Sequence, residues 1–168
     1  MVDTDRNYLI EANEFASKYT SCVKVPVGAI YTNGKYKYIA CNLGEYNCKE
    51  HGECYRKTIG KEQSCEENRK YCKAIHSEIN LIKEIEDDSI YLKENLDLSE
   101  GTVYVSRYPC RNCTENLISN GFKRVVYGGE QEVSKEVLEL FKKNDVELIH
   151  ISDIDYEDHK KNGYEIRN

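Results

Sequence analysis

Residues 102–127 read TVYVSRYPCRNCTENLISNGFKRVVY. The stretch begins with a short β-branched run, Thr102 to Ser106, and ends with a second one, Arg124 to Tyr127. Between them, Cys110 to Asn120 has the length and spacing of a helix, and Gly121 marks its end. The sequence therefore predicts a strand–helix–strand unit, the building block of an α/β sheet.

The segments before this unit add a helix and a hairpin. Apolar residues recur at helical spacing from Arg6 to Lys18, which predicts an amphipathic first helix. Asn33-Gly34 joins two β-rich runs, Val25 to Tyr31 and Lys35 to Cys41, and an Asn-Gly pair in this position is a strong hairpin signal. We therefore expect two antiparallel strands after the first helix.

The remaining periodic segments complete the pattern. Apolar residues from His76 to Ile85 predict another amphipathic helix, closed by an acidic turn at Glu86-Asp87-Asp88. A last strand is expected from Glu147 to Ile151. The apolar positions of the helix before it are Val133, Val137, Leu138 and Phe141. A hairpin followed by strand, helix, strand, helix and strand predicts the α/β class, in a layered sandwich.

The composition is that of a soluble globular protein. The 168 residues are 39% hydrophobic and 32% charged, so we expect a single domain over residues 1–168. No apolar run is long enough to span a bilayer and Met1 to Asp5 lacks the features of a signal peptide, so a cytoplasmic location is expected. The net charge of −6 favours a small substrate over a polynucleotide.

A polar segment separates the hairpin from the second helix. Asn42 to Tyr71 is rich in Cys, Glu and Lys and has no sustained periodicity, so we expect an irregular, Cys-rich insert at about residues 42–72. The chain has eight cysteines and no export signal, and the cytosol keeps thiols reduced. Metal ligation therefore explains these cysteines better than a disulfide framework.

Two fragments carry the residues of a zinc centre. His76-Ser77-Glu78 and Pro109-Cys110-Arg111-Asn112-Cys113 match the zinc-deaminase signature, in which one His and two Cys bind the metal and the Glu does not. Three protein ligands leave a fourth position for water, whose pKa the metal lowers. The spacing of the two cysteines at a predicted helix start directs both sulfurs to one side and favours thiolates. We expect His76, Cys110 and Cys113 to hold a catalytic zinc ion and Glu78 to transfer protons.

A different interpretation is a zinc-stabilised binding module without catalysis. A lone Cys-x-x-Cys pair is often half of a structural zinc knuckle, and a lone His is often an ordinary core or surface residue. Glu78 argues against this alternative, because a closed structural site has no use for a carboxylate beside a metal-bound water.

Several other stretches share a pattern with one family. They are Ser21-Cys22-Val23-Lys24, Val27-Gly28-Ala29, Asn42-Leu43-Gly44, Cys54-Tyr55-Arg56, the loop from Gly60 to Ser64, Cys72 to Asn80 and Gly121 to Tyr127. Together with the two zinc fragments, they make the chain from about Ser21 to Ile151 resemble the cytidine and deoxycytidylate deaminase superfamily, and most closely the deoxycytidylate deaminases.

This resemblance implies a three-layer α/β/α sandwich with a mixed five-stranded sheet. It implies hydrolytic deamination of 2′-deoxycytidine 5′-monophosphate (dCMP) to dUMP and ammonia, which supplies thymidylate synthesis. It also implies a homo-oligomer whose neighbouring subunits help to form each site, with dCTP and dTTP as effectors. Another cytosine nucleoside or nucleotide, or an RNA base, is the alternative substrate, and the acidic net charge counts against RNA.

The resemblance also assigns substrate contacts. By position, Asn42 and Asn80 would hold the sugar hydroxyl or orient the base, and Tyr108 would pack beside the ring. The candidates for a phosphate contact are Lys24, Arg56 and Arg107. Arginine suits this role by its planar fork, but a solvated surface charge explains each cation equally well. Turn or helix-surface positions explain the two asparagines, and a core position explains the tyrosine.

The chain departs from the family pattern at three places. Ser77 stands where alanine is usual and adds a hydroxyl near the metal, and Lys24 stands where arginine is usual. The acidic Glu86-Asp87-Asp88 follows a helix whose end often carries a basic residue in relatives. The last two differences weaken the phosphate assignment more than the deaminase assignment.

The surplus cysteines resemble a second metal site. Some deoxycytidylate deaminases carry a structural zinc between the end of the first helix and the insert. Cys22, Cys48, Cys54 and Cys72 match that arrangement best, and His51 or Cys65 is an alternative for one of them. A closed four-ligand site would offset the ordering entropy of an insert that has little core of its own. The alternative is that several of these are free thiols.

Overall fold

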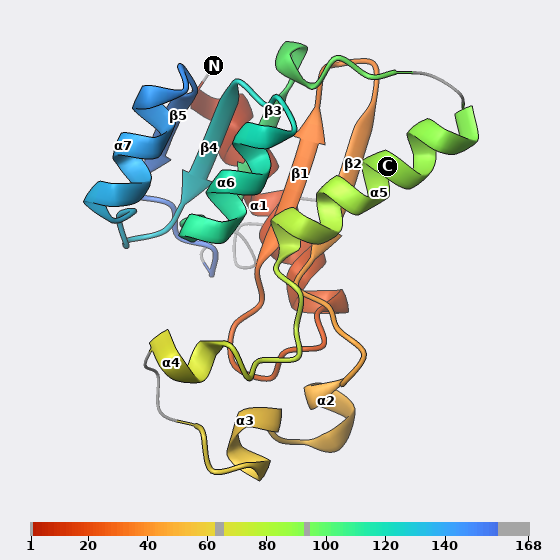
Figure 1. Ribbon diagram of the computed structural model, residues 1–168, viewed down its shortest axis with the longest axis vertical. Helices are drawn as coiled ribbons and strands as arrows, with labels where there is room; N and C mark the ends of the chain where they lie inside the picture. Colours follow the sequence, from red (N-terminus) through yellow and green to blue (C-terminus); the bar gives the residue numbers. More distant parts are fainter. Residues whose placement is uncertain (1, 63–65, 93–94, 158–168) are drawn as a thin grey trace.

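Five strands form one mixed sheet in the computed structural model, which describes residues 2–62, 66–92 and 95–157 (Figure 1). They are β1 (Gly28–Thr32), β2 (Lys37–Cys41), β3 (Thr102–Val105), β4 (Arg124–Gly128) and β5 (Glu147–Ile151), in the order β2-β1-β3-β4-β5. β1 pairs antiparallel with β2 and β3, whereas β3, β4 and β5 are parallel. The predicted mixed five-stranded sheet is confirmed.

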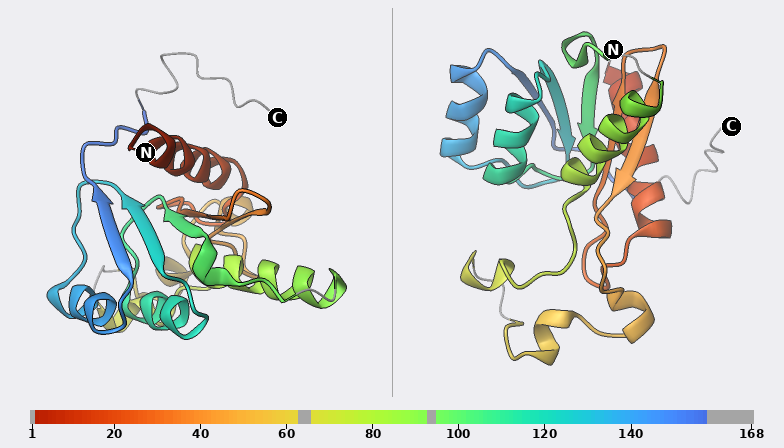
Figure 2. Two further views of the ribbon diagram at one scale, coloured as in Figure 1. Left: turned by 90° about the horizontal axis from the view of Figure 1, so that it is seen from above. Right: turned by 45° about the vertical axis from the view of Figure 1, so that its right-hand side comes forward.

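Helices cover both faces of the sheet, which confirms the three-layer α/β/α sandwich (Figures 1 and 2). On one face lies α1 (Val2–Tyr19), and on the other lie α5 (Ser77–Leu92), α6 (Arg111–Ser119) and α7 (Lys135–Lys143). Successive strand side chains alternate between the two cores, as a pleated strand requires. Val103 and Val105 join the cluster that includes α5, α6 and α7 residues, while Tyr104 joins the cluster beside α1.

Local sequence signals account for the turns that connect these elements. In the hairpin, Asn33 Oδ1 accepts hydrogen bonds from the Lys35 and Tyr36 amides at 3.1 and 2.8 Å, and Gly34 adopts a φ of 86°. Gly121 follows α6 with a φ of 88°, the left-handed conformation that glycine takes at helix ends. A short 3₁₀ turn, η1 (Leu98–Glu100), precedes β3.

The acidic turn predicted at Glu86-Asp87-Asp88 is wrong, because α5 continues through these residues to Leu92. Glu86 and Asp87 are exposed, so their charges remain solvated on the outer face of the helix. Asp88 accepts a hydrogen bond from Tyr38 Oη on β2 at 2.5 Å. No glycine or proline interrupts the segment, so the acidic residues alone do not end the helix.

The Cys-rich insert projects beyond the carboxyl ends of the parallel strands (Figure 1). It contains three helices of four residues each, α2 (Cys48–His51), α3 (Tyr55–Thr58) and α4 (Glu66–Arg69). The predicted irregular segment is therefore broken by single helical turns, the first of which is capped by Asn47. None of the helices in the described residues is both long and apolar enough to cross a membrane.

Candidate active site

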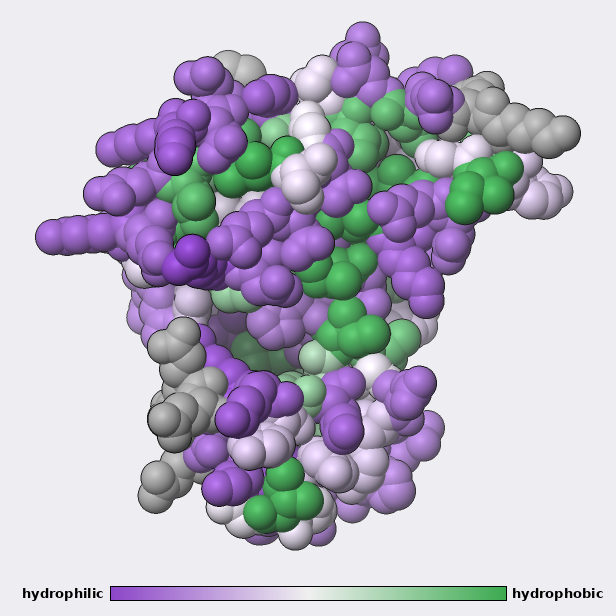
Figure 3. Space-filling model, in the orientation of Figure 1, coloured by the Kyte–Doolittle hydropathy of each residue, from purple (hydrophilic) through white to green (hydrophobic). Residues whose placement is uncertain are grey.

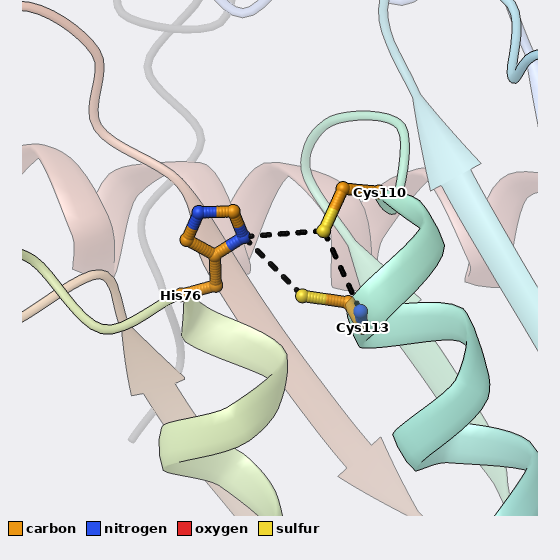
Figure 4. Close-up of side chains that lie close together, drawn as sticks. All are labelled: His76, Cys110 and Cys113. Atoms are coloured by element: carbon orange, nitrogen blue, oxygen red, sulfur yellow. Dashed lines mark hydrogen bonds between the residues drawn. The ribbon is translucent and has the colours of Figure 1, made fainter. Parts of the chain in front are cut away.

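Two helix starts bring three metal-ligating side chains together at the carboxyl end of β3 (Figure 4). His76 immediately precedes α5, and its carbonyl accepts the Asn80 amide at 3.1 Å. Cys110 is the N-cap of α6, where its sulfur accepts the Cys113 amide at 3.4 Å. Cys113 lies one turn into α6 and is buried, whereas Cys110 is partly buried and His76 is exposed. In Figure 3 the surface is indented below these helix starts, between the sheet and the insert.

The separations within this group fit a tetrahedral zinc ion. His76 Nδ1 lies 3.5 Å from Cys110 Sγ and 3.3 Å from Cys113 Sγ. Zinc–sulfur bonds of about 2.3 Å and zinc–nitrogen bonds of about 2.0–2.1 Å place tetrahedral N and S ligands roughly 3.5 Å apart. All three ligand atoms lie within 4.8 Å of one another, and no other such group of three His, Cys, Asp or Glu side chains occurs in the described part of the chain.

The site favours a thiolate at Cys110. Its hydrogen bond with Cys113, together with the hydrogen bond and charge of His76, outweighs burial and lowers the pKa of Cys110 to about 4. The same hydrogen bond and burial raise the pKa of Cys113, so the two sulfurs share one proton in the absence of metal. The bond with Cys110 also raises the pKa of His76. A metal ion that displaces these protons would meet a nitrogen and two sulfurs already aimed at one point.

Glu78 lies buried beside this group. Glu78 is 3% exposed, and this burial raises the pKa of its carboxyl. The charge of His76 and a hydrogen bond from Ser77 act in the opposite direction and lower that pKa. Ser77 is fully buried and donates to Glu78 Oε2 at 3.0 Å. The Ser77 hydroxyl therefore engages one oxygen of the Glu78 carboxylate and leaves the other oxygen without a bond to Ser77.

Asn42 and Asn80 brace the backbone around the site. Asn42 Oδ1 accepts from Thr20 Oγ1 at 2.6 Å and from the Val27 amide at 2.9 Å, and its Nδ2 donates to the Val25 carbonyl at 2.9 Å. These bonds join the end of α1, the segment before β1 and the end of β2. Within the described residues, the second hydrogen of Asn42 Nδ2 has no hydrogen-bond partner.

The Asn80 side chain secures the start of α5. Its Nδ2 donates to the carbonyls of Cys41, Leu43 and Ile75 at 2.9–3.3 Å. Leu43 and Ile75 form an isolated antiparallel bridge directly before His76. Asn80 therefore fixes the chain that presents His76.

The phosphate candidates occupy different surroundings. Lys24 pairs with Glu62 at 3.3 Å, and hydrogen bonds and charge from Arg56 lower the pKa of Cys54 against its burial. Arg107 is exposed and, with Tyr108, lines a cavity of about 680 Å³. Of the three, only Arg107 lines this cavity, because Arg56 lies within the insert and Lys24 pairs with a residue of the insert. None of the four residues of the zinc motifs lines the cavity.

The four insert-side cysteines are neighbours but do not form a closed ligand set. Burial raises the pKa of Cys48, and the charges of Cys54, Cys22 and Cys72 add to the rise, which places the four within electrostatic reach. Backbone amides point at two of the sulfurs: Val25 N lies 3.5 Å from Cys22 Sγ, and Tyr55 N lies 3.4 Å from Cys48 Sγ. His51 stacks on Tyr46 at 4.3 Å, whereas Cys65 lies outside the described residues.

Two supporting residues are apparent only in the structure. The sequence marks Ser77 as unusual, but its bond to Glu78 depends on the rotamer that burial imposes. Thr20 donates to both the carbonyl and the side chain of Asn42, 22 residues away, and no local pattern predicts this pairing.

Comparison with known proteins places this geometry in a family. Residues 2–129 match the family model described as the cytidine and deoxycytidylate deaminase zinc-binding region. No curated protein sequence matches the chain significantly.

Solved structures share the fold at low identity. A dCMP deaminase from the cyanophage S-TIM5, in complex with dCMP and dUMP, aligns with a TM-score of 0.60 and 16% identity over 89% of this chain and 97% of the other. A diaminohydroxyphosphoribosylaminopyrimidine deaminase/reductase from Thermotoga maritima aligns with a TM-score of 0.59 and 19% identity over 88% of this chain and 36% of the other. A guanine deaminase from Nitrosomonas europaea aligns with a TM-score of 0.53 and 15% identity over 86% of this chain and 75% of the other.

Proposed function

The chain belongs to the cytidine and deoxycytidylate deaminase family, and from this premise we propose that it hydrolyses dCMP to dUMP and ammonia. The observation that carries the proposal is the buried Glu78 carboxylate next to the converging His76, Cys110 and Cys113 side chains. A closed structural site would use a fourth protein ligand, whereas this group has three and a carboxylate beside them.

His76 Nδ1, Cys110 Sγ and Cys113 Sγ would hold the zinc ion. When bound, zinc supplies a water molecule acidified toward neutrality. The N-terminal ends of α5 and α6 point at the site, and their partial positive charge favours the Cys110 thiolate. The ligand donors are therefore held before the metal arrives, which reduces the entropy lost on binding it.

Glu78 moves the protons of the reaction. Its carboxylate accepts a proton from the attacking water and delivers one to N3 of the cytosine ring while oxygen bonds to C4. Glu78 then takes the proton of the C4 hydroxyl and passes it to the amino group, the C4–N bond breaks to release ammonia, and a carbonyl forms at C4. Burial raises the pKa of the Glu78 carboxyl, which helps it to hold the transferred proton.

Arg107 is the phosphate contact that its place in the chain favours. It lies in the loop that leads into Cys110, and Tyr108 next to it is partly buried against the core. Asn42 would offer its remaining amide hydrogen to the sugar. Asn80 would act on the substrate through His76, because its amide hydrogens already engage the backbone.

A second, structural zinc ion would be held by Cys22, Cys48, Cys54 and Cys72. Against its burial, hydrogen bonds and charge from Arg56 lower the pKa of Cys54, which favours the thiolate that zinc requires. Binding would draw the four sulfurs together and supply the insert with a cross-link in place of a core.

Several wider properties belong to the same proposal. Residues 1–168 would form one cytoplasmic deaminase domain that contains the insert at 42–72. The active form would be a homo-oligomer that responds to dCTP and dTTP. A dCMP deaminase shares the fold over nearly its whole length, which supports a nucleotide substrate.

The test is ammonia release by the zinc-loaded protein from dCMP, with CMP, deoxycytidine, dCTP and guanine in parallel. We expect a clear preference for dCMP. Turnover of another member alone would keep the hydrolytic chemistry and overturn the substrate. Turnover of none would overturn the enzyme and favour a zinc-stabilised binding module.

A variant pair tests phosphate recognition. Arg107→Gln should raise KM for dCMP about tenfold or more while leaving deoxycytidine turnover unchanged, because a charge-assisted hydrogen bond is worth about 1.5–3 kcal/mol. Arg56→Gln is the matched control and should leave KM for dCMP unchanged. An equal loss for dCMP and deoxycytidine in Arg107→Gln would contradict the assignment.

A further inference from the structure

The chain that follows β5 returns across the end of the sheet and binds the loop that leads into the site. Tyr156 Oη donates to the Ser106 carbonyl at 2.6 Å. The Tyr156 ring is partly buried in the cluster beside α1, together with Ile154. This contact joins residues that are 50 positions apart in the sequence.

The bond needs the glycine at the end of β4. A Cβ atom at Gly128 would lie 2.2 Å from Tyr156 Oη and 3.1 Å from Ile154 Cγ2. Because side chains do not approach so closely, any other residue at 128 would displace the tyrosine hydroxyl from Ser106. The free space above Gly128 is thus occupied by the group that makes the contact.

Ser106 is held at its other polar groups as well. Its amide donates to the Gly28 carbonyl at 2.9 Å, and its Oγ accepts the Gly28 amide at 2.9 Å. Together with Tyr156, these bonds engage the amide, the hydroxyl and the carbonyl of a fully buried residue. Ser106 is therefore a fixed point directly after β3.

The fixed point is close to the chemistry along the chain. Ser106 comes four residues before Cys110, so their Cα atoms are at most roughly 14 Å apart. Pro109, with its restricted φ, stands between them. Arg107 and Tyr108 also line the 680 Å³ cavity together with residues 152–157, although none of the four residues of the zinc motifs lines it.

We propose that Tyr156 is a positioning residue of the active site, whose hydroxyl fixes Ser106 and so sets where Arg107 and Tyr108 meet the substrate. This inference rests on the proposed function. Cys110 is held in place independently of Ser106, because it is the N-cap of α6 and the metal would bind its sulfur. Losing the Tyr156 hydroxyl should therefore disturb substrate binding more than metal binding or the chemical step.

Tyr156→Phe removes the hydroxyl and keeps the ring. We expect KM for dCMP to rise about threefold to tenfold, the scale of one lost hydrogen bond, with kcat and zinc content unchanged. Tyr38→Phe is the matched control, because it also loses a half-buried hydroxyl bond, to Asp88 at the far end of α5. We expect no change in KM there. Gly128→Ala should reproduce the effect by displacing an intact Tyr156.

Amide hydrogen exchange separates this inference from the proposed substrate. In Tyr156→Phe and Gly128→Ala, exchange should accelerate at the amides of residues 107–110 other than Pro109, and not in α5, whether or not dCMP is turned over. Unchanged exchange at 107–110 would overturn the positioning role, as would a fall in kcat and zinc content at constant KM. A wild-type protein that turns over no cytosine nucleotide, with faster loop exchange in the variants, would overturn the proposed substrate alone.

Discussion

The two cysteine groups of this chain are held by different kinds of structure. Cys110 and Cys113 stand at the start of a nine-residue helix packed on the sheet, and His76 precedes a helix of 16 residues. Cys48 and Cys54 border helices of four residues, which are too short to be stable alone. The side chains of the first group therefore converge without a metal, whereas the positions of the second group depend on loops.

This contrast shows what each site gains from zinc. At the helix starts the fold has already ordered the three side chains, so a zinc ion there would supply chemistry. For the insert, zinc would supply the order itself. The predictions below test whether the two sites differ in this way.

The largest expected effect concerns chemistry at the first site. Glu78→Gln should reduce kcat on the order of 10²–10⁴-fold, because general acid–base catalysis contributes that much. Zinc content should remain unchanged, since the carboxylate is not a ligand. Steady-state kinetics and metal analysis check both, with Glu53→Gln in the insert as the control. Full turnover by Glu78→Gln at normal zinc content would remove the residue from the mechanism.

The second effect concerns thiol ionisation in the metal-free protein. Cys110 should stay ionised down to about pH 4, whereas burial raises the pKa of Cys48 above its ordinary value near 9. Ultraviolet thiolate absorbance, compared with that of Cys110→Ser and Cys48→Ser, measures each. Titration of both sulfurs in one pH range would erase the contrast.

The lowered pKa of Cys110 has a consequence for stability. Between pH 4 and 9 the folded state binds fewer protons at Cys110 than the unfolded state does. Its contribution is therefore fully present above the unfolded pKa and is lost as the pH falls through about 4. Denaturation of metal-free wild type should show this acid-side loss, and Cys110→Ser should lack it.

The third effect concerns metal content and order in the insert. Cys48→Ser should lower zinc from two ions per chain to one and accelerate amide exchange at 47–58, while kcat changes little. Cys41→Ser, a buried cysteine of β2 outside both groups, is the control. One zinc ion per wild-type chain would contradict the structural site.

The smallest effect tests how finely the first site is arranged. Ser77→Ala should lower kcat about twofold to tenfold at constant KM, since the net value of one hydrogen bond is about 0.5–1.5 kcal/mol. Ser119→Ala, which removes an exposed hydroxyl bond in α6, is the control. An unchanged kcat in Ser77→Ala would show that burial alone orients Glu78.

Much of the fold was predictable because its signals are local. Alternating β-branched runs, Asn33-Gly34 and Gly121 report on a few neighbouring residues, and they predicted the five strands and the helix before β4. The end of α5 was misjudged because exposed acidic residues are compatible with both a turn and a helix. The helix is stabilised there by a hydrogen bond from Tyr38 on β2 to Asp88.

The candidate site divides in the same way. His76, Glu78, Cys110 and Cys113 form two short motifs, so the sequence by itself determined which residue types would supply the chemistry. The approach of His76 to Cys110 and Cys113, at 3.3–3.5 Å, was decided by the packing of α5 and α6 on the sheet. Tertiary packing also decided three hydrogen bonds: Thr20 to Asn42, Ser77 to Glu78 and Tyr156 to Ser106. Motifs report on covalent neighbours, whereas these contacts depend on burial and on approaches between distant segments, which arise only when the chain is folded.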